Sequence, residues 1–198
     1  MKQIYLHGLG QNPDSWSKVI EQLETAEHSM CPDLSELVQG QDTTYQNLYA
    51  AFSAMCDEIE EDICLCGLSL GGVLALNYAI EHPEKIKGLV LIATQYKMPK
   101  KLLRVQNAIF RFMPKSMFQQ TGFGKSDFLK LCNTMMELDF SDSIYNVSCP
   151  TLVIYGEKDR ANKNASIELA NMLIDAELQV FNGVGHEINI EAPATLEE

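Results

Sequence analysis

The chain has 198 residues, of which 46% are hydrophobic and 21% charged, and its formal net charge is −12. These values predict one globular domain with a substantial core, and the negative charge argues against a nucleic-acid partner. No apolar run approaches the roughly 20 residues that a membrane-spanning helix needs. The first predicted strand starts next to Met1, which leaves no room for a signal peptide. We therefore expect a cytoplasmic protein without a membrane span.

The six cysteines are scattered along the chain. Cys64 and Cys66 alternate within a predicted strand, where they would behave as small apolar side chains. No C-x-x-C pair and no cysteine–histidine spacing is typical of a zinc site. We expect free thiols, no metal site and no cofactor.

Predicted strands and helices alternate along the chain. The predicted strands cover residues 3–6, 28–32, 62–66, 87–93, 150–155 and 177–182. The predicted helices cover residues 15–26, 44–60, 70–81 and 164–174, and a last helix starts within 193–198. This alternation indicates an α/β protein with a doubly wound, mostly parallel six-stranded sheet and helices on both faces. Active sites in such sheets lie at the carboxyl ends of the strands.

Residues 94–148 differ in charge from the rest of the chain. They contain eight Lys/Arg and four Asp/Glu, a net charge of +4, whereas the remainder has a net charge of −16. We interpret this segment as a helical cap inserted into a core that is formed by residues 1–93 and 149–198.

Two helices are predicted within the cap. The first, residues 100–112, is basic and amphipathic, and the second, residues 126–138, begins with Ser126 as its capping residue. Apolar side chains of the cap would form an adaptable roof over a substrate pocket; they are Phe110, Phe112, Met113, Met135 and Met136. Membrane binding by the first helix is the alternative interpretation. The positive charge would also attract an anionic substrate.

The segment Gly67-Leu68-Ser69-Leu70-Gly71 lies between a predicted buried strand and a predicted buried helix. This context makes G-x-S-x-G a nucleophile elbow, in which the serine adopts a strained backbone conformation. The glycines remove Cβ atoms that would collide in so tight a turn. Ser69 is therefore the candidate nucleophile.

A serine hydroxyl needs a general base, and the base needs a third group that orients it. Among the four histidines, His28 and His82 lie in polar segments, and we expect His7 to hold the loop after the first strand. His186 follows the strand 177–182 in a loop with glycines, and Asp159 follows the strand before it. Both residues thus lie just beyond strand ends. The order along the chain, Ser69, Asp159, His186, is the order expected for an α/β-hydrolase sheet.

Four segments together make the chain resemble the α/β-hydrolase fold superfamily nearly end to end. They are His7-Gly8-Leu9-Gly10, the elbow, Tyr155-Gly156-Glu157-Lys158-Asp159, and Gly185-His186. The resemblance implies that Ser69 is the nucleophile, His186 the base and then the acid, and Asp159 the orienting group. It also implies that the backbone N–H groups of Leu9 and Leu70 form the oxyanion hole.

The chain departs from this pattern at both ends. Compared with the full eight-stranded sheet, the first hairpin is absent and the last helix is short, so the expected strand order is 4-3-5-6-7-8 in family numbering. The short helix leaves part of one sheet face less covered, and a second subunit in a homodimer is one candidate to cover it. Residues 160–162 also lack the Val-Pro pair of many relatives.

The preferred interpretation is a serine hydrolase that cleaves a carboxylic ester or thioester of a small, largely apolar substrate through an acyl-enzyme. A lyase or C–C hydrolase with the same triad is an alternative, in which cap residues hold a charged substrate; the candidates are Lys97, Arg104, Arg111 and Lys115. A ligand-binding or regulatory protein that retains the pocket is a second alternative.

Overall fold

The computed structural model describes residues 1–114, 118 and 122–196. The strands of this part of the chain form one parallel sheet of six, with the order β2-β1-β3-β4-β5-β6. They are β1 (Lys2–Leu6), β2 (Ser29–Met30), β3 (Ile63–Leu68), β4 (Ile86–Ile92), β5 (Thr151–Gly156) and β6 (Ala176–Phe181). The predicted fold class and strand order are confirmed.

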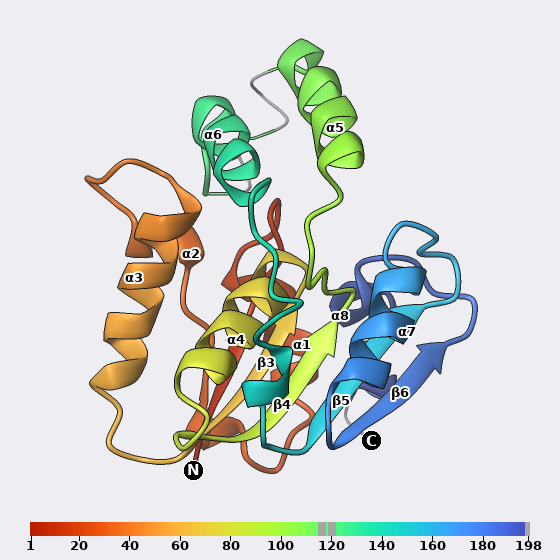
Figure 1. Cartoon of the computed structure of the whole chain (residues 1–198). Coiled ribbons are helices and arrows are strands. Elements are labelled where there is room, and N and C mark those ends of the chain that lie inside the picture. Colours follow the sequence, from red (N-terminus) through yellow and green to blue (C-terminus); the bar gives the residue numbers. More distant parts are fainter. Residues whose placement is uncertain (115–117, 119–121, 197–198) are drawn as a thin grey trace.

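Helices cover both faces of the sheet (Figure 1). One face carries α3 (Tyr45–Asp57), α4 (Leu70–Glu81) and α7 (Lys163–Met172), and the other carries α1 (Ser17–Ile20) and α8 (Ile188–Glu191). Successive strand residues point to opposite faces, so the sheet contributes to two separate core clusters. Ile4 and Leu65 belong to the cluster beneath α3 and α4, whereas Tyr5 packs with Trp16 in the other.

The start of α4 packs directly against the sheet backbone. A Cβ added to Gly71 would lie 2.2 Å from the carbonyl oxygen of Leu6 in β1, and one added to Gly67 would lie 2.4 Å from the Gly71 carbonyl. The helix is buried from Leu70 to Ile80, which explains its continuous apolar sequence. Direct backbone contact with β1 and β3, with no side chain between them, therefore sets the position of the first turn of α4.

Two further helices, α5 (Lys100–Phe112) and α6 (Lys125–Met135), lie beyond the carboxyl ends of the strands (Figure 1). They pack against each other, and the rings of Phe110 and Phe128 meet edge to face at 4.8 Å. The segments that lead to and from these helices pair through an antiparallel bridge between Lys97 and Asp139. This pairing joins both ends of the helical segment at one place above the sheet.

The predicted helix over residues 15–26 is wrong in its extent. A 3-10 helix, η1 (Pro13–Trp16), leads into the one-turn α1, and the chain then continues in turns, with Leu23 N donating to Ile20 O at 3.1 Å. A second 3-10 helix, η2 (Ala26–His28), directly precedes β2. The apolar residues of the segment still pack in the second core cluster; they are Trp16, Val19, Ile20 and Leu23.

The ends of two other predicted helices also differ. Gly124 rather than Ser126 is the N-cap of α6, so the predicted serine cap is wrong. The expected helix within 193–198 is replaced by α8 and the 3-10 helix η5 (Pro193–Thr195), and residues 197–198 lie outside the described part. Pro193 lacks a backbone N–H and therefore interrupts the helix after Ala192.

Two short elements were not predicted. The one-turn helix α2 (Leu34–Leu37) is capped by Asp33, whose side chain accepts a hydrogen bond from Ser35 N at 2.8 Å. The 3-10 helix η4 (Ile144–Asn146) precedes β5. Helices this short leave no apolar periodicity in the sequence.

The sheet face on the side of α1 and α8 is only partly covered. Cys66, Val90 and Leu152 are half-buried there and line a shallow groove of about 120 Å³ with Trp16 and Leu196. All six cysteines are free, as predicted. That a second subunit covers this face stays a prediction.

We predict that Gly71→Ala destabilises the fold by about 3 kcal/mol, because its Cβ would overlap the backbone of β1. The free energy of unfolding in urea, followed through the fluorescence of the single buried tryptophan Trp16, measures the change. Gly40→Ala is the control: nothing lies within 4 Å of its Cβ position, and only its positive φ of 80° opposes alanine, at a cost of about 1 kcal/mol. Equal losses in the two variants would contradict this account of the elbow.

Candidate active site

Ser69 lies at the turn from β3 to α4, with φ 52° and ψ −111°. Such a conformation costs about 1–3 kcal/mol in a residue other than glycine and is held here by its surroundings. Its backbone N–H donates to Ile92 O at 2.8 Å, and its carbonyl accepts from Val73 N at 2.9 Å. The hydroxyl makes no hydrogen bond with any described residue, so its proton and lone pairs are available at the end of the sheet.

Asp159 and His186 meet beyond the ends of β5 and β6. His186 Nδ1 lies 2.6 Å from Asp159 Oδ2, although 27 residues separate them in the sequence. Their loops are joined by a bond from Lys158 N to Val184 O, 2.9 Å long. Gly156 permits this approach, because a Cβ there would lie 2.0 Å from Gly185 O. The structure thus brings together two side chains that the sequence places in separate loops.

Asp159 is the charged member of this pair. Burial alone would raise the pKa of its carboxyl, but hydrogen bonds from His186 and Asn162 outweigh burial and lower the pKa below its usual value of 3.8. The ionised carboxylate therefore stabilises the folded chain above that pH, and this contribution is lost as the pH falls through the lowered pKa. Because the carboxylate accepts a hydrogen bond from Nδ1–H, Nε2 of a neutral His186 is left as the basic nitrogen.

Asn162 is a member of the site that the sequence reasoning missed. Its side-chain nitrogen donates to Asp159 Oδ2 at 2.8 Å and lies 3.2 Å from His186 Nδ1. Its backbone N–H points to Asp159 Oδ1 at 3.3 Å, and its side-chain oxygen accepts from Gln95 Nε2 at 2.8 Å. An Asp-x-x-Asn spacing directly before a helix is the one sequence signal that would have pointed to it.

One cavity of about 580 Å³ is lined by Ser69, Asp159 and His186 together. Leu9 and Leu70, the predicted oxyanion donors, line the same cavity. Ser69 Oγ and His186 form no hydrogen bond in the described structure. In serine–histidine sites this contact often tightens only when substrate is engaged.

Two backbone N–H groups at the cavity are without partners. Neither Leu9 N nor Leu70 N donates to another residue of the described part of the chain. Leu70 is the first residue of α4, where helix N–H groups are unpaired and the helix dipole favours negative charge. Leu9 lies in the facing loop after β1. The arrangement is able to bind an oxygen anion from both sides.

His7 holds that loop, as predicted. It is fully buried; its Nε2 accepts from Leu34 N at 3.1 Å, and its Nδ1 lies 3.0 Å from Gly8 O, to which it donates. Burial lowers the pKa of the ring below its usual value, despite the hydrogen bond to Gly8. His7 is therefore a neutral side chain that fixes the loop and is not a second base.

Apolar side chains from α5, α6 and the segment before them form the roof of the cavity. They are Met98, Leu103, Val105, Ile109, Phe110, Phe128, Cys132 and Met135. Two of the five predicted roof residues, Phe110 and Met135, are thus at the cavity. Phe112, Met113 and Met136 are not, and Phe112 is 88% exposed.

The positions of Met113 and Met136 have a helical explanation. Met113 follows the last residue of α5 and packs beside Phe118 and Phe128. Met136 follows the last residue of α6, and one residue turns the side chain by about 100° from Met135. It faces a separate groove with Arg104. The prediction for these two methionines is corrected accordingly.

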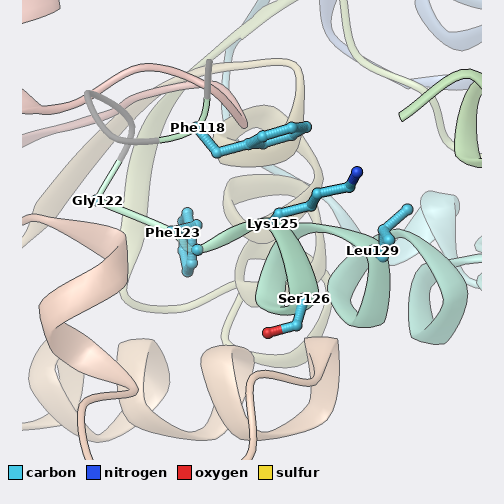
Figure 2. A pocket seen from close by; sticks show the side chains of 7 residues that line it. Phe118, Gly122, Phe123, Lys125, Ser126 and Leu129 are labelled. Atoms are coloured by element: carbon cyan, nitrogen blue, oxygen red, sulfur yellow. The ribbon is translucent and has the colours of Figure 1, made fainter. Parts of the chain in front are cut away.

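A second hollow, of about 650 Å³, lies at the start of α6 (Figure 2). Figure 2 shows the side chains of Phe118, Phe123, Lys125, Ser126 and Leu129 around it. None of the candidate catalytic residues lines this hollow. The candidate site is therefore the cavity with Ser69.

Within the described residues, no group of three or more His, Cys, Asp or Glu side chains is placed to hold a metal ion. No helix of this part of the chain is both long and apolar enough to span a bilayer.

The sequence model of the α/β hydrolase family matches residues 4–198. The chain belongs to the α/β hydrolase family. A curated relative, the pimeloyl-[acyl-carrier protein] methyl ester esterase of Aromatoleum aromaticum, is 36% identical over 91 residues, which are 46% of this chain and 36% of the esterase. Lipase 3 of a Moraxella species is 24% identical over 233 residues, covering 96% of this chain and 72% of the lipase.

Solved structures of other proteins share the fold. An enol-lactonase from Burkholderia xenovorans superposes with a TM-score of 0.83 at 18% identity, over 99% of this chain and 88% of the lactonase. A thermophilic esterase from Thermogutta terrifontis superposes with a TM-score of 0.80 at 19% identity, over 100% of this chain and 86% of the esterase. The arrangement of sheet and helices is therefore that of this hydrolase family.

We predict that Asn162→Leu lowers kcat/KM for an ester substrate about ten- to a hundredfold, because one charge-assisted hydrogen bond to Asp159 is worth about 1.5–3 kcal/mol. The pKa of Asp159 should rise at the same time, since the carboxylate loses a donor; an NMR titration of its side chain measures this. Asn146→Leu, an exposed asparagine in η4, is the control. An unchanged pKa of Asp159 would show that Asn162 does not support the carboxylate.

Proposed function

We propose that the chain is a serine hydrolase that cleaves a carboxylic ester or thioester of a largely apolar substrate through an acyl-enzyme. The observation that carries the proposal is the Asp159–His186 pair at 2.6 Å in one cavity with the strained Ser69. The esterase and lipase names of the curated relatives agree with this class of reaction. In the proposal, Ser69, His186 and Asp159 are the catalytic residues.

Acylation begins when Ser69 Oγ attacks the carbonyl carbon and its proton passes to Nε2 of His186. Asp159 accepts a hydrogen bond from the Nδ1–H group and, while remaining ionised, stabilises the imidazolium that forms. The carbonyl oxygen becomes an anion that accepts hydrogen bonds from the N–H groups of Leu9 and Leu70, each worth about 3 kcal/mol in the transition state. The tetrahedral intermediate then expels the alcohol or thiol, which takes the proton from His186.

Deacylation repeats these steps with water. His186 removes a proton from the water as its oxygen attacks the acyl carbon, and the same two N–H groups hold the second oxyanion. The intermediate releases the carboxylic acid, and Ser69 Oγ regains the proton from His186. The cycle needs no metal ion or cofactor.

The roof of the cavity indicates the kind of acyl group. Its side chains from α5 and α6 are apolar, and the flexible side chain of Met135 is able to adapt to different chain shapes. We further propose that residues 94–148 act as a cap that selects the acyl chain, on a core made of residues 1–93 and 149–198. Phe110 and Met135 contact the substrate in this proposal.

The alternative of a lyase or C–C hydrolase requires basic groups that hold a charged substrate. None of the described candidates lines the cavity with Ser69. Lys97 pairs with Asp139 at 2.7 Å, and Arg104 and Arg111 face the separate groove with Met136. Lys115 lies outside the described residues. The arrangement therefore favours ester or thioester hydrolysis.

Ser69→Ala should reduce hydrolysis of p-nitrophenyl butyrate by at least about a thousandfold with folding unchanged, as deletion of a triad member usually does. A fluorophosphonate probe should label the wild type at Ser69 and not label the variant. Ser126→Ala, in the second hollow, is the control and should retain full activity. Equal rates in wild type and Ser69→Ala would reject the mechanism, and failure of the probe to label folded wild type would favour the ligand-binding alternative.

A series of p-nitrophenyl esters of increasing acyl length tests the cap. Ile109→Ala should raise KM for an octanoate ester about three- to tenfold and leave an acetate ester unchanged, because Ile109 lines the cavity and loses apolar contact with the longer chain. Phe112→Ala is the matched control: it lies on the same helix, is 88% exposed and does not line the cavity. The same shift in both variants would contradict a chain-binding role for the roof.

A further inference from the structure

Two buried amide side chains, Gln11 and Asn189, connect the loop of Leu9 to the segment after His186. Gln11 is 7% exposed and Asn189 is fully buried. They are 178 residues apart in the sequence and form two hydrogen bonds with each other, each 3.2 Å long. Gln11 follows Leu9 by two residues and Asn189 follows His186 by three. Their contact therefore joins the two sides of the proposed site.

The carboxamide of Gln11 uses its full capacity for hydrogen bonds. Its Oε1 accepts from Gly8 N and from Asn189 Nδ2, both at 3.2 Å. Its Nε2 donates to Asn189 Oδ1 and to Glu187 Oε1, both at 3.2 Å. A primary amide has two donors and two acceptor sites, so none is left unused. Exchanging the oxygen and nitrogen would oppose two donors at Gly8, and the network therefore permits one orientation of the side chain.

The same contacts hold the backbone on both sides. Gly8 O accepts from Gln11 N at 3.1 Å while Gly8 N donates to the Gln11 side chain, so Leu9 lies at the tip of a closed loop. Gly10 permits the closure with a φ of 100°. On the other side, Asn189 Nδ2 also donates to Ser15 O at 3.2 Å. In the described part of the chain, every side-chain hydrogen bond between residues 7–16 and 183–191 involves Gln11 or Asn189.

We propose that Gln11 and Asn189 are positioning residues that fix the Leu9 N–H relative to the imidazole of His186; this rests on the proposed function. During acylation the N–H must reach the oxyanion while His186 takes the proton from Ser69, so both groups must be placed around one carbonyl carbon. Ser69 and Leu70 are already placed by β3 and α4. The amide pair supplies the remaining link, between the facing loop and the base.

The proposal separates the effects on kcat and KM. Loss of the amide pair allows the oxyanion donor and the base to shift relative to each other, which should lower kcat about ten- to a hundredfold. KM should remain within about twofold, because the roof on α5 and α6 is untouched. If the two amides serve only as core packing, their loss reduces the free energy of unfolding but leaves kcat of the folded enzyme unchanged.

The experiment compares Gln11→Met, Asn189→Leu and the double variant with wild type on p-nitrophenyl butyrate, at a temperature where circular dichroism shows each variant fully folded. We expect each single variant to lose kcat as stated above. The double variant should have a kcat no lower than that of the less active single variant, because the pair acts as a unit. Asn12→Ala is the control: it removes a neighbouring half-buried amide that is outside the network, and its kcat should equal that of wild type.

If these variants do not fold, a second pair of variants, in which the side chains keep their size, tests the same role. Gln11→Glu keeps an acceptor for Gly8 N but loses both N–H donors and places its charge beside Glu187. Adding Glu187→Gln supplies a donor in the reverse direction, so the double variant should recover part of kcat. Glu187 is exposed, which makes this exchange tolerable for folding.

The outcomes distinguish the two proposals. Wild-type kcat in folded Gln11→Met and Asn189→Leu, or in Gln11→Glu, overturns the positioning role while the inactivity of Ser69→Ala leaves the serine mechanism intact. Losses that multiply in the Gln11/Asn189 double variant also overturn it, since independent sites would then explain them. Full activity of Ser69→Ala rejects the proposed function instead, and the positioning role with it.

Discussion

Direct backbone contact at glycines is the constraint on which the arrangement of this site depends. Gly71 lies against the carbonyl of Leu6, and Gly67 lies against Gly71, so the first turn of α4 touches the sheet with no side chain between them. Gly156 lies in the same way against the carbonyl of Gly185. Packed interiors leave no free space for an added methyl group. The positions of Ser69 and His186 are therefore set by main-chain contacts, which are stiffer than contacts between side chains.

The parallel sheet turns these local contacts into a site. The end of β3 presents Ser69, the end of β5 is followed by Asp159, and the end of β6 is followed by His186. Because parallel strands end at the same edge, these residues line one cavity although they are far apart in the sequence, and Asp159 and His186 form a hydrogen bond. The Asp159 carboxylate remains charged although it is buried, since His186 and Asn162 both donate to it. Burial without these donors would favour the neutral acid.

The helices α5 and α6 have a different relation to the sheet. They contact each other through Phe110 and Phe128, while Val105 and Ile109 of α5 line the cavity and remain more than half exposed. The first acidic residue after Thr94 is Asp127, so α5 presents only positive charge on its polar side. Beside an acidic core, this places an apolar cavity roof within a locally positive surface.

The sequence predicted the elements that depend on local pattern. The six strands were predicted from the alternation of strands and helices, and their order from the resemblance to the α/β-hydrolase fold. The helix α4 was predicted at its observed bounds of 70–81, because a buried helix next to a glycine turn leaves a continuous apolar run. Short elements were not readable: α2 and η1 contain four residues each, too few for a period to appear. The helix predicted over residues 15–26 was too long, because this segment consists of such short elements, separated by turns.

The candidate site divides in the same way. Ser69, Asp159 and His186 were identifiable because each stands in a recognisable segment at a strand end. Asn162, Gln11 and Asn189 were not, because their roles arise from hydrogen bonds between loops that only the folded sheet brings together. Met113 and Met136 were placed wrongly over the cavity, since the sequence gives the composition of a helix but its rotation and end point depend on packing. Local sequence thus determined which residues are chemically able to act. Tertiary structure decided which of them meet, because contacts across the sheet have no signature in the order of residues along the chain.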